Sequence, residues 1–161
     1  MHRVGQFVAH VRARVAPEEA ALAAQILPAS AHLLFIAMPV ADRRHALDVV
    51  DRLLAKGIDD RDLLAAALLH DAAKGHRMRL WHRIAGVLLE AAAPWLLRRL
   101  ASTDPRSWRH PFHLYLHHGR LSAEMATVAG CGPRVGEFIR GLADGDDAQL
   151  QRALAAADDA S

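Results

Sequence analysis

A histidine followed directly by an aspartate, His70 and Asp71, stands at the end of an apolar stretch that runs from Leu63 to Leu69. The stretch has helical periodicity, so a helix there would carry the pair into the core of the protein. An isolated carboxylate in that position is costly, and a bound cation offsets the cost. Imidazole nitrogens and carboxylate oxygens are common ligands of divalent metals. The pair therefore predicts a metal site, in a chain that contains 11 histidines.

Two further residues are candidates for the same metal. His45 lies next to the predicted inward stripe of the preceding helix, close to the start of that helix. Consecutive helices joined by a short turn pack antiparallel, so the start of one lies beside the end of the next. An oxygen ligand from further along the chain would complete the set. Asp158 is the first candidate because it shares a helix face with Leu154, and Asp146 is the alternative.

With these residues in this order, the sequence resembles the HD superfamily of metal-dependent phosphohydrolases over about residues 42–159. The pattern of that family is a His, a His-Asp pair and a distant Asp, all carried on helices. The resemblance implies that the metal ligands are His45, His70, Asp71 and Asp158. It also implies that Asp71 takes part in catalysis and that Lys74, in a His-Asp-x-x-Lys arrangement, contacts the phosphate or the transition state.

The expected ligand set contains two neutral imidazoles and two carboxylates, which leave a divalent ion near charge balance with open coordination positions. Such a site suits Mn, Fe, Co, Ni or Mg better than a closed zinc site. A metal-activated water is expected to attack phosphorus in a phosphomonoester or phosphodiester. Lys74 and the nearby Arg77 or Arg79 would neutralise charge on the phosphate. The expected substrate is a small phosphorylated molecule, for example a nucleotide.

The later part of the family pattern is only partly present. The segment that begins at His118, with His117 beside it, is similar to the segment that supplies a second-metal or substrate ligand in binuclear family members. Those members carry further histidines in the helix that follows, whereas residues 132–145 contain none. We therefore expect one metal ion rather than two. The alternative function is a catalytically degenerate HD domain that binds a ligand or a partner.

The elements that must position these residues are expected to be helices, in an all-α bundle of the HD type. The hydrophobic share of 52% contains much alanine and few β-branched residues, and aromatic residues make up 5%. We predict roughly seven to nine helices, without strands or internal repeats. One helix is expected over residues 42–57, and the next from Asp59 or Asp60 to about Lys74. A helical pattern over residues 80–100 is interrupted by Pro94. Helical spacing resumes over residues 112–129, 135–142 and 148–157.

A chain of 161 residues is expected to form one domain. Within it, we expect residues 1–40 to be a helical extension packed on a core of residues 42–159. The composition excludes disordered, collagen-like and disulfide-rich secreted proteins, because the hydrophobic share is high and Cys131 is the only cysteine. No apolar stretch has the length of a signal peptide or of a membrane span. We therefore expect a cytoplasmic protein.

Positive charge is concentrated in the middle of the chain. Residues 74–109 hold eight Lys and Arg but only two Asp and Glu, although the net charge of the whole chain is +2. This imbalance predicts an anionic partner, which is phosphate, nucleic acid or an anionic membrane surface, and the alternative is a helix face that is only solvated. One set of large apolar residues in the same segment alternates with arginines, and it consists of Trp81, Ile84, Leu88 and Trp95. We expect them to lie in a core helix with arginines at its edge. A helix that lies on anionic lipid is the alternative.

Overall fold

The computed structural model describes residues 15–161, and this part of the chain is all-α, without a strand. The all-α class predicted from the composition is therefore confirmed. Its elements are α2 (Pro17–Ile26), α3 (Ala29–Ile36), α4 (Val40–Ala55), α5 (Arg61–Leu69), α6 (Leu80–Ala92), α7 (Pro94–Leu100), α8 (His110–Val128), α9 (Pro133–Arg140), the 3-10 helix η1 (Gly145–Asp147) and α10 (Ala148–Asp159). The first fourteen residues of the expected N-terminal extension lie outside the described part.

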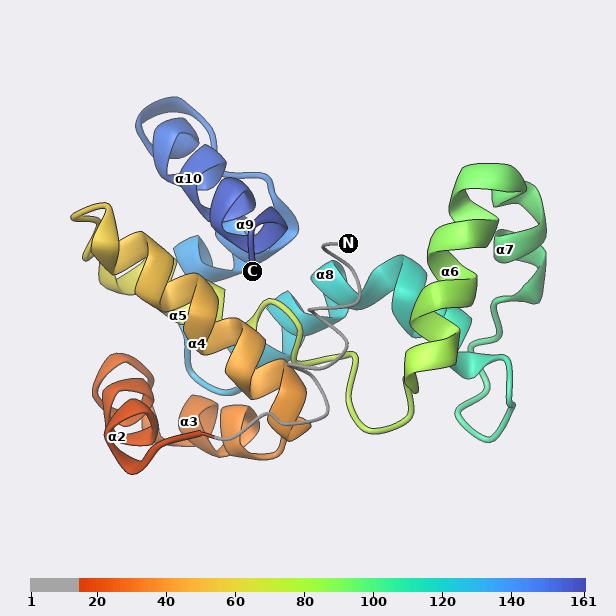
Figure 1. The fold of residues 1–161 in the computed structure, drawn as a ribbon, viewed down its shortest axis with the longest axis horizontal. Coiled ribbons are helices and arrows are strands. Elements are labelled where there is room, and N and C mark those ends of the chain that lie inside the picture. The colour runs from red at the N-terminus through yellow and green to blue at the C-terminus, as the bar shows by residue number, and fades with distance from the viewer. Residues whose placement is uncertain (1–14) are drawn as a thin grey trace.

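Helix α5 lies at the centre of a body that also contains α2, α3, α4, α9 and α10 (Figure 1). Each of these helices packs against α5, and so does the second half of α8. Every residue of α5 from Leu63 to Leu69 is buried. A helix that is apolar on all sides has to be surrounded in this way, since any uncovered face would leave hydrophobic surface in water.

The start of α5 follows local signals, whereas its end does not. Asp60 caps the helix, because its Oδ1 accepts a hydrogen bond from the Leu63 backbone N–H at 2.9 Å. The prediction that this helix continues to about Lys74 was wrong: α5 ends at Leu69, and tight turns follow from His70 onwards. Ser122 of α8 is the physical reason, because its hydroxyl accepts a hydrogen bond from the Ala73 backbone N–H at 3.0 Å. That N–H would otherwise donate to the carbonyl of Leu69 in a continued helix.

Helices α6 and α7 form a hairpin that stands apart from the body and packs on the first half of α8 (Figure 1). We call residues 77–109, which contain this hairpin, the arm. The predicted interruption at Pro94 is confirmed, since α6 ends at Ala92 and Pro94 is the first residue of α7. Helix α8 runs from the arm into the body (Figure 1). The ion pair between Arg83 of α6 and the buried Asp42 of α4 links the two parts, with Nη2 2.7 Å from Oδ1.

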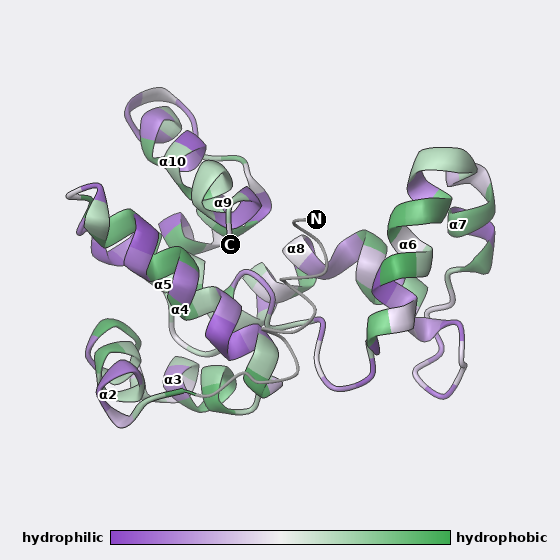
Figure 2. Ribbon diagram, in the orientation of Figure 1, coloured by the Kyte–Doolittle hydropathy of each residue, from purple (hydrophilic) through white to green (hydrophobic). Residues whose placement is uncertain are grey.

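The expectation that the apolar residues of the arm form a core helix was wrong. Trp81, Ile84, Leu88 and Trp95 are between 49% and 66% exposed. Figure 2 shows long hydrophobic stretches on α6 and α7, at the edge of the molecule. The reason is that α6 packs on α8 through a different face, which contains the buried His82 and Gly86. None of the described helices is long and apolar enough to cross a membrane.

Candidate metal centre

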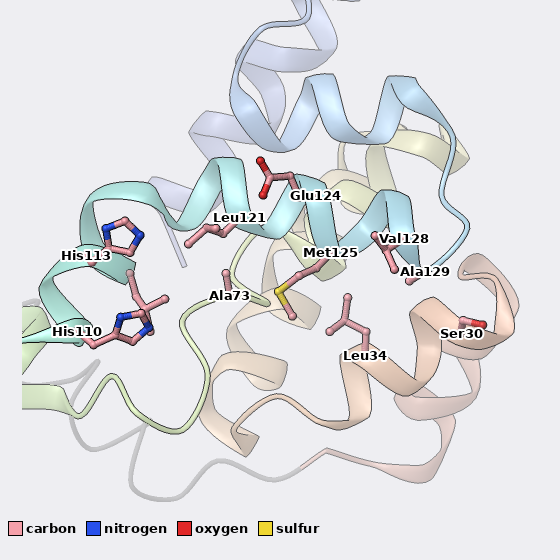
Figure 3. Close-up of a pocket in the computed structure, with 11 residues that line it drawn as sticks. Ser30, Leu34, Ala73, His110, His113, Leu121, Glu124, Met125, Val128 and Ala129 are labelled. Carbon is pink, nitrogen blue, oxygen red and sulfur yellow. The ribbon is translucent and has the colours of Figure 1, made fainter. Parts of the chain in front are cut away.

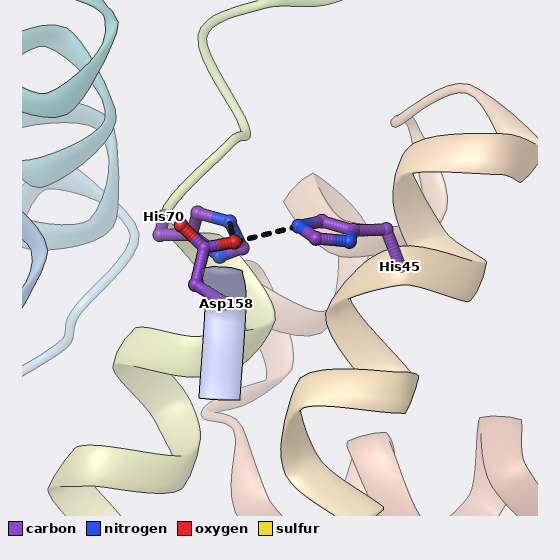
Figure 4. A group of neighbouring side chains, drawn as sticks. All are labelled: His45, His70 and Asp158. Carbon is purple, nitrogen blue, oxygen red and sulfur yellow. Dashed lines mark hydrogen bonds and ion pairs between the residues drawn. The ribbon is translucent and has the colours of Figure 1, made fainter. Parts of the chain in front are cut away.

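Three side chains from distant parts of the chain meet at one end of the α4–α5 pair (Figure 4). His45 lies on α4, His70 directly follows α5, and Asp158 lies in the last turn of α10. Asp158 Oδ1 is 2.8 Å from His45 Nε2 and 3.3 Å from His70 Nε2. One ligand atom from each of the three residues lies within 4.8 Å of the others. The spacing is therefore compatible with a shared metal ion.

The orientation of His70 leaves one ring nitrogen available as a ligand. His70 Nδ1 lies 2.9 Å from the carbonyl oxygen of Ala67, and a carbonyl only accepts, so Nδ1 carries the hydrogen and donates it. In the neutral ring, Nε2 then carries the lone pair. This Nε2 atom is buried and has no hydrogen-bond partner in the described part of the chain. A backbone carbonyl that fixes the tautomer in this way is typical of a metal-binding histidine.

Asp71 lies beside this group and is almost completely buried, with 2% of its side chain exposed. Its Oδ2 accepts a hydrogen bond from Lys74 Nζ at 2.6 Å. Its Oδ1 is 3.6 Å from His70 Nε2 and, like that nitrogen, has no hydrogen-bond partner among residues 15–161. The structure thus places two buried atoms without partners, one nitrogen and one oxygen, next to each other.

The charges of the site favour a cation between its carboxylates. Burial alone would raise the pKa of Asp71, but the cations of His70 and Lys74 outweigh burial and bring the pKa to about 2. Burial likewise opposes ionisation of Asp158, but its hydrogen bond with His45 and the positive charge of His70 hold its pKa well below the usual range. Burial lowers the pKa of His70, and the two carboxylates reverse this and raise it to about 9. Both carboxylates are therefore ionised at neutral pH and attract positive charge.

The adjacent residues His117 and His118 have different surroundings. His118 Nδ1 donates to the carbonyl of Tyr115 at 2.8 Å, and its Nε2 lies 4.0 Å from Asp71 Oδ1. Burial lowers the pKa of His118, and the positive charge of Lys74 lowers it further. His117 is exposed, and its ring lies against the ring of His113, with 4.6 Å between the centroids. Of the two histidines, His118 is the one that faces the candidate metal centre.

The other expected site residues lie elsewhere. Asp146, the alternative ligand, is exposed in η1 and does not belong to the group around His45. Arg77 and Arg79 line a separate pocket of about 510 Å³, together with Arg106. No residue of the candidate metal centre lines that pocket.

Ser122 belongs to the segment that begins at His118, but its role at this site was not predicted from the sequence. It is completely buried, and its hydrogen bond to Ala73 holds the turn that follows Asp71. Ser122 lies four residues after His118, so the two side chains share one face of α8. That spacing was the signal that would have pointed to it.

A mostly apolar pocket of about 680 Å³ reaches the same turn (Figure 3). Ala73 forms part of its wall, and Leu34 of α3 and Met125 of α8 line it further along. His110 and His113 lie at one end of the pocket in Figure 3. The pocket can accept an apolar group close to the turn that carries Asp71.

Comparisons of the chain with known protein families, with curated proteins and with solved structures found no match.

Proposed function

We propose that this protein is a metal-dependent phosphohydrolase of the HD type, which hydrolyses a phosphoester of a small phosphorylated molecule such as a nucleotide. One observation carries the proposal: His70 Nε2 and Asp71 Oδ1 are both buried, lie 3.6 Å apart and have no hydrogen-bond partner in the described chain. Leaving such atoms without a partner is costly, and a divalent cation satisfies both at once. His45 and Asp158 supply the other two ligands.

The donor set fits a hard or borderline divalent ion. Two imidazole nitrogens and two carboxylates suit Mn, Fe, Co, Ni or Mg, and their formal charges balance that of the ion. When bound, the ion supplies Lewis acidity, since it lowers the pKa of a coordinated water and polarises a phosphoryl oxygen. The partly exposed side chains of His45 and Asp158 leave the site accessible to water and substrate.

Lys74 has two roles in this proposal. Its ammonium group donates to Asp71 Oδ2 at 2.6 Å and so holds the carboxylate with Oδ1 directed toward His70. Its side chain is 20% exposed, so the same cation can meet a phosphate oxygen of the substrate. The apolar part of the substrate would enter the pocket that begins at Ala73.

We propose one metal ion. His118 faces Asp71 Oδ1 from 4.0 Å, where it serves as a neutral contact for the substrate phosphate. A second ion at that position would need ligands from the following helix, and residues 132–145 contain no histidine. A cytoplasmic location is part of the proposal, and it agrees with a chain whose single cysteine, Cys131, cannot form an internal disulfide.

The test of the site is metal analysis of protein purified without chelator. We expect about one transition metal per chain in the wild type and at least tenfold weaker binding in His70→Ala, Asp71→Ala and Asp158→Ala. The matched control is Asp146→Ala, which removes an exposed aspartate from the same C-terminal region and should bind metal like the wild type. A wild type that stays free of metal after incubation with Mn, Fe or Ni would refute the proposal.

The test of the reaction is a screen of phosphomonoesters and phosphodiesters with the metal-loaded protein. We expect turnover in the wild type, and at least about a hundredfold lower kcat in Lys74→Met when the two proteins are compared at equal metal occupancy, because the variant loses a charge on the phosphate. The alternative is a degenerate HD domain that only binds its ligand. In that case a nucleotide would raise the Tm but would not be hydrolysed.

A further inference from the structure

The arm exposes a continuous apolar stripe on α6. Its five large residues are between 36% and 62% exposed, and they are Leu80, Trp81, Ile84, Val87 and Leu88. Their spacing places them on one face of the helix. Trp95 of α7 and Trp108 of the following loop, each 66% exposed, add two more large side chains to the surface of the arm. A monomeric protein rarely leaves so much contiguous apolar surface in water.

The stripe faces away from the other described helices. The two buried residues of α6 are His82 and Gly86, which lie on the opposite face of the helix. Gly86 is so close to α8 that an added Cβ would lie 2.7 Å from the ring of Tyr115. Helix α6 therefore packs through a small residue and an imidazole, and presents its large hydrophobic residues outward. This is the reverse of an ordinary surface helix.

A cationic pocket of about 510 Å³ adjoins the stripe. Three arginines line it, namely Arg77, Arg79 and Arg106, together with the indoles of Trp81 and Trp108. None of the three guanidinium groups pairs with a carboxylate among residues 15–161. Trp81 belongs to both the stripe and the pocket, so apolar surface and positive charge are continuous.

The positive charge of the arm favours an anionic partner. The arm holds seven arginines but only two acidic residues, Glu90 and Asp104. Arg83 is occupied by Asp42, and Arg109 by the carbonyls of Arg99 and Leu100. The remaining five are exposed and have no acidic partner in the described chain, and they are Arg77, Arg79, Arg98, Arg99 and Arg106. Among the acids, Glu90 accepts from the Tyr115 hydroxyl and forms no ion pair with these arginines in the described chain.

We propose that the arm docks on the surface of an anionic lipid bilayer. The stripe would enter the boundary between headgroups and acyl chains, the indoles would lie at that boundary, and the arginines would bind lipid phosphates. A second copy of the chain fits less well, because a two-fold interface would bring the same cations together. A nucleic acid fits less well too, since it would leave Ile84, Val87 and Leu88 in water.

The experiment is vesicle sedimentation combined with tryptophan fluorescence of the whole protein. All three tryptophans, Trp81, Trp95 and Trp108, lie in the arm, so the emission reports on the arm alone. We expect binding and a shift of emission to shorter wavelength with vesicles of phosphatidylcholine mixed with phosphatidylglycerol. Binding should weaken between low and physiological salt, and vesicles of phosphatidylcholine alone should bind at least tenfold less.

Two variants separate the contributions of the arm. Ile84→Ser/Leu88→Ser shortens the stripe, and Arg98→Gln/Arg99→Gln removes two charges; each should lower the affinity for the anionic vesicles at least about tenfold. The matched control is Leu33→Ser/Val128→Ser, which changes two residues of the body that are 67% and 90% exposed. It should bind like the wild type. Circular dichroism verifies that each variant is folded.

Four outcomes would overturn the proposal. They are absence of binding to the anionic vesicles at low salt, equal binding to both kinds of vesicle, an equal loss in the control variant, and a wild-type dimer that Ile84→Ser/Leu88→Ser dissociates. Binding of a DNA or RNA duplex that needs Arg98 and Arg99 but not Ile84 and Leu88, without vesicle binding, would assign the arm to nucleic acid instead. Vesicle binding does not depend on the phosphohydrolase activity, so the two proposals fail separately.

Discussion

Backbone hydrogen bonds decide what each buried imidazole can do. His70 and His118 each donate from Nδ1 to the carbonyl three residues earlier, so each ring in its neutral form directs an unprotonated Nε2 toward Asp71. His82 in the arm has the opposite hydrogen-bonding role at Nδ1, since this atom accepts a hydrogen bond from the Arg79 backbone N–H at 3.2 Å. One residue type therefore serves as a candidate ligand in the body and as a neutral acceptor in the arm.

The acceptor role of His82 predicts a pH dependence of stability. Burial lowers the pKa of His82, and the positive charge of Arg79 lowers it further, so the unfolded chain takes up the proton first as the pH falls below about 6.5. The neutral ring thus stabilises the fold at neutral pH, and this stability is lost as the pH falls toward the folded-state pKa. The slope cannot exceed about 1.4 kcal/mol per pH unit for one proton.

Urea unfolding followed by tryptophan fluorescence between pH 7.5 and 5.5 measures this dependence. His82→Asn keeps an acceptor close to the position of Nδ1 but does not titrate, so we expect a smaller loss of stability on acidification than in the wild type. The exposed His76 provides the control variant His76→Asn, which should follow the wild type. Equal slopes for the wild type and His82→Asn would show that His82 does not contribute.

At the scale of elements, the contact between α6 and α8 depends on a missing side chain. A Cβ at Gly86 would lie 2.7 Å from the Tyr115 ring, and that ring is held in place by the hydrogen bond from its hydroxyl to Glu90 at 2.7 Å. The two helices can approach this closely only because position 86 is glycine. Through α8, this contact sets the position of the arm relative to the body.

Alanine at Gly86 is therefore expected to destabilise the arm. The steric conflict with Tyr115 should exceed the gain in helix propensity, giving a net loss of about 1–2 kcal/mol in the free energy of unfolding. The matched control is Gly136→Ala in the middle of α9, where an added Cβ finds its nearest neighbour at 3.8 Å. Because nothing has to move there, the control should be neutral or stabilising by up to about 1 kcal/mol. Equal effects in both variants would contradict the close approach.

At the scale of the whole molecule, the pair of Asp42 and Arg83 is the most buried of the polar contacts that join the arm to the body in the described chain. Asp42 is 2% exposed on α4, and both of its oxygens accept from Arg83 Nη2, at 2.7 and 2.8 Å. A carboxylate in that position needs a cation, since burial without one is costly. The same helix α4 carries His45 one turn later, so the ion pair between Asp42 and Arg83 connects the arm to a helix of the candidate metal centre.

Removing the positive charge of Arg83 should weaken the attachment of the arm to the body. Arg83→Met leaves Asp42 buried without a partner, and we expect a loss of about 2–4 kcal/mol in the free energy of unfolding. The matched control is Arg120→Met, which breaks an ion pair with Glu124 whose side chains are 54% and 57% exposed. It should cost less than about 1 kcal/mol. Urea titrations measure the free energy of unfolding of both variants. Similar losses in the two variants would show that the ion pair between Arg83 and Asp42 does not stabilise the attachment of the arm.

Much of the architecture was predictable from local patterns. The helical class, the break at Pro94, the start of α5 near Asp60 and the order of the later helices all follow from propensity, capping and periodicity, which depend on residues a few positions apart. The proximity of His45 to His70 was predictable for a related reason, because two consecutive helices joined by a short turn pack antiparallel.

The remaining features were decided by contacts between residues far apart in the chain. Ser122 of α8 ends α5 before Lys74, α10 brings Asp158 rather than Asp146 beside the two histidines, and Arg83 reaches Asp42. The exposure of Ile84 and Leu88 was also decided by contacts between distant residues. Periodicity identifies the apolar face of a helix but does not say which neighbour covers it. On α6 that neighbour is α8, and it covers the opposite face because Gly86 permits the closer approach.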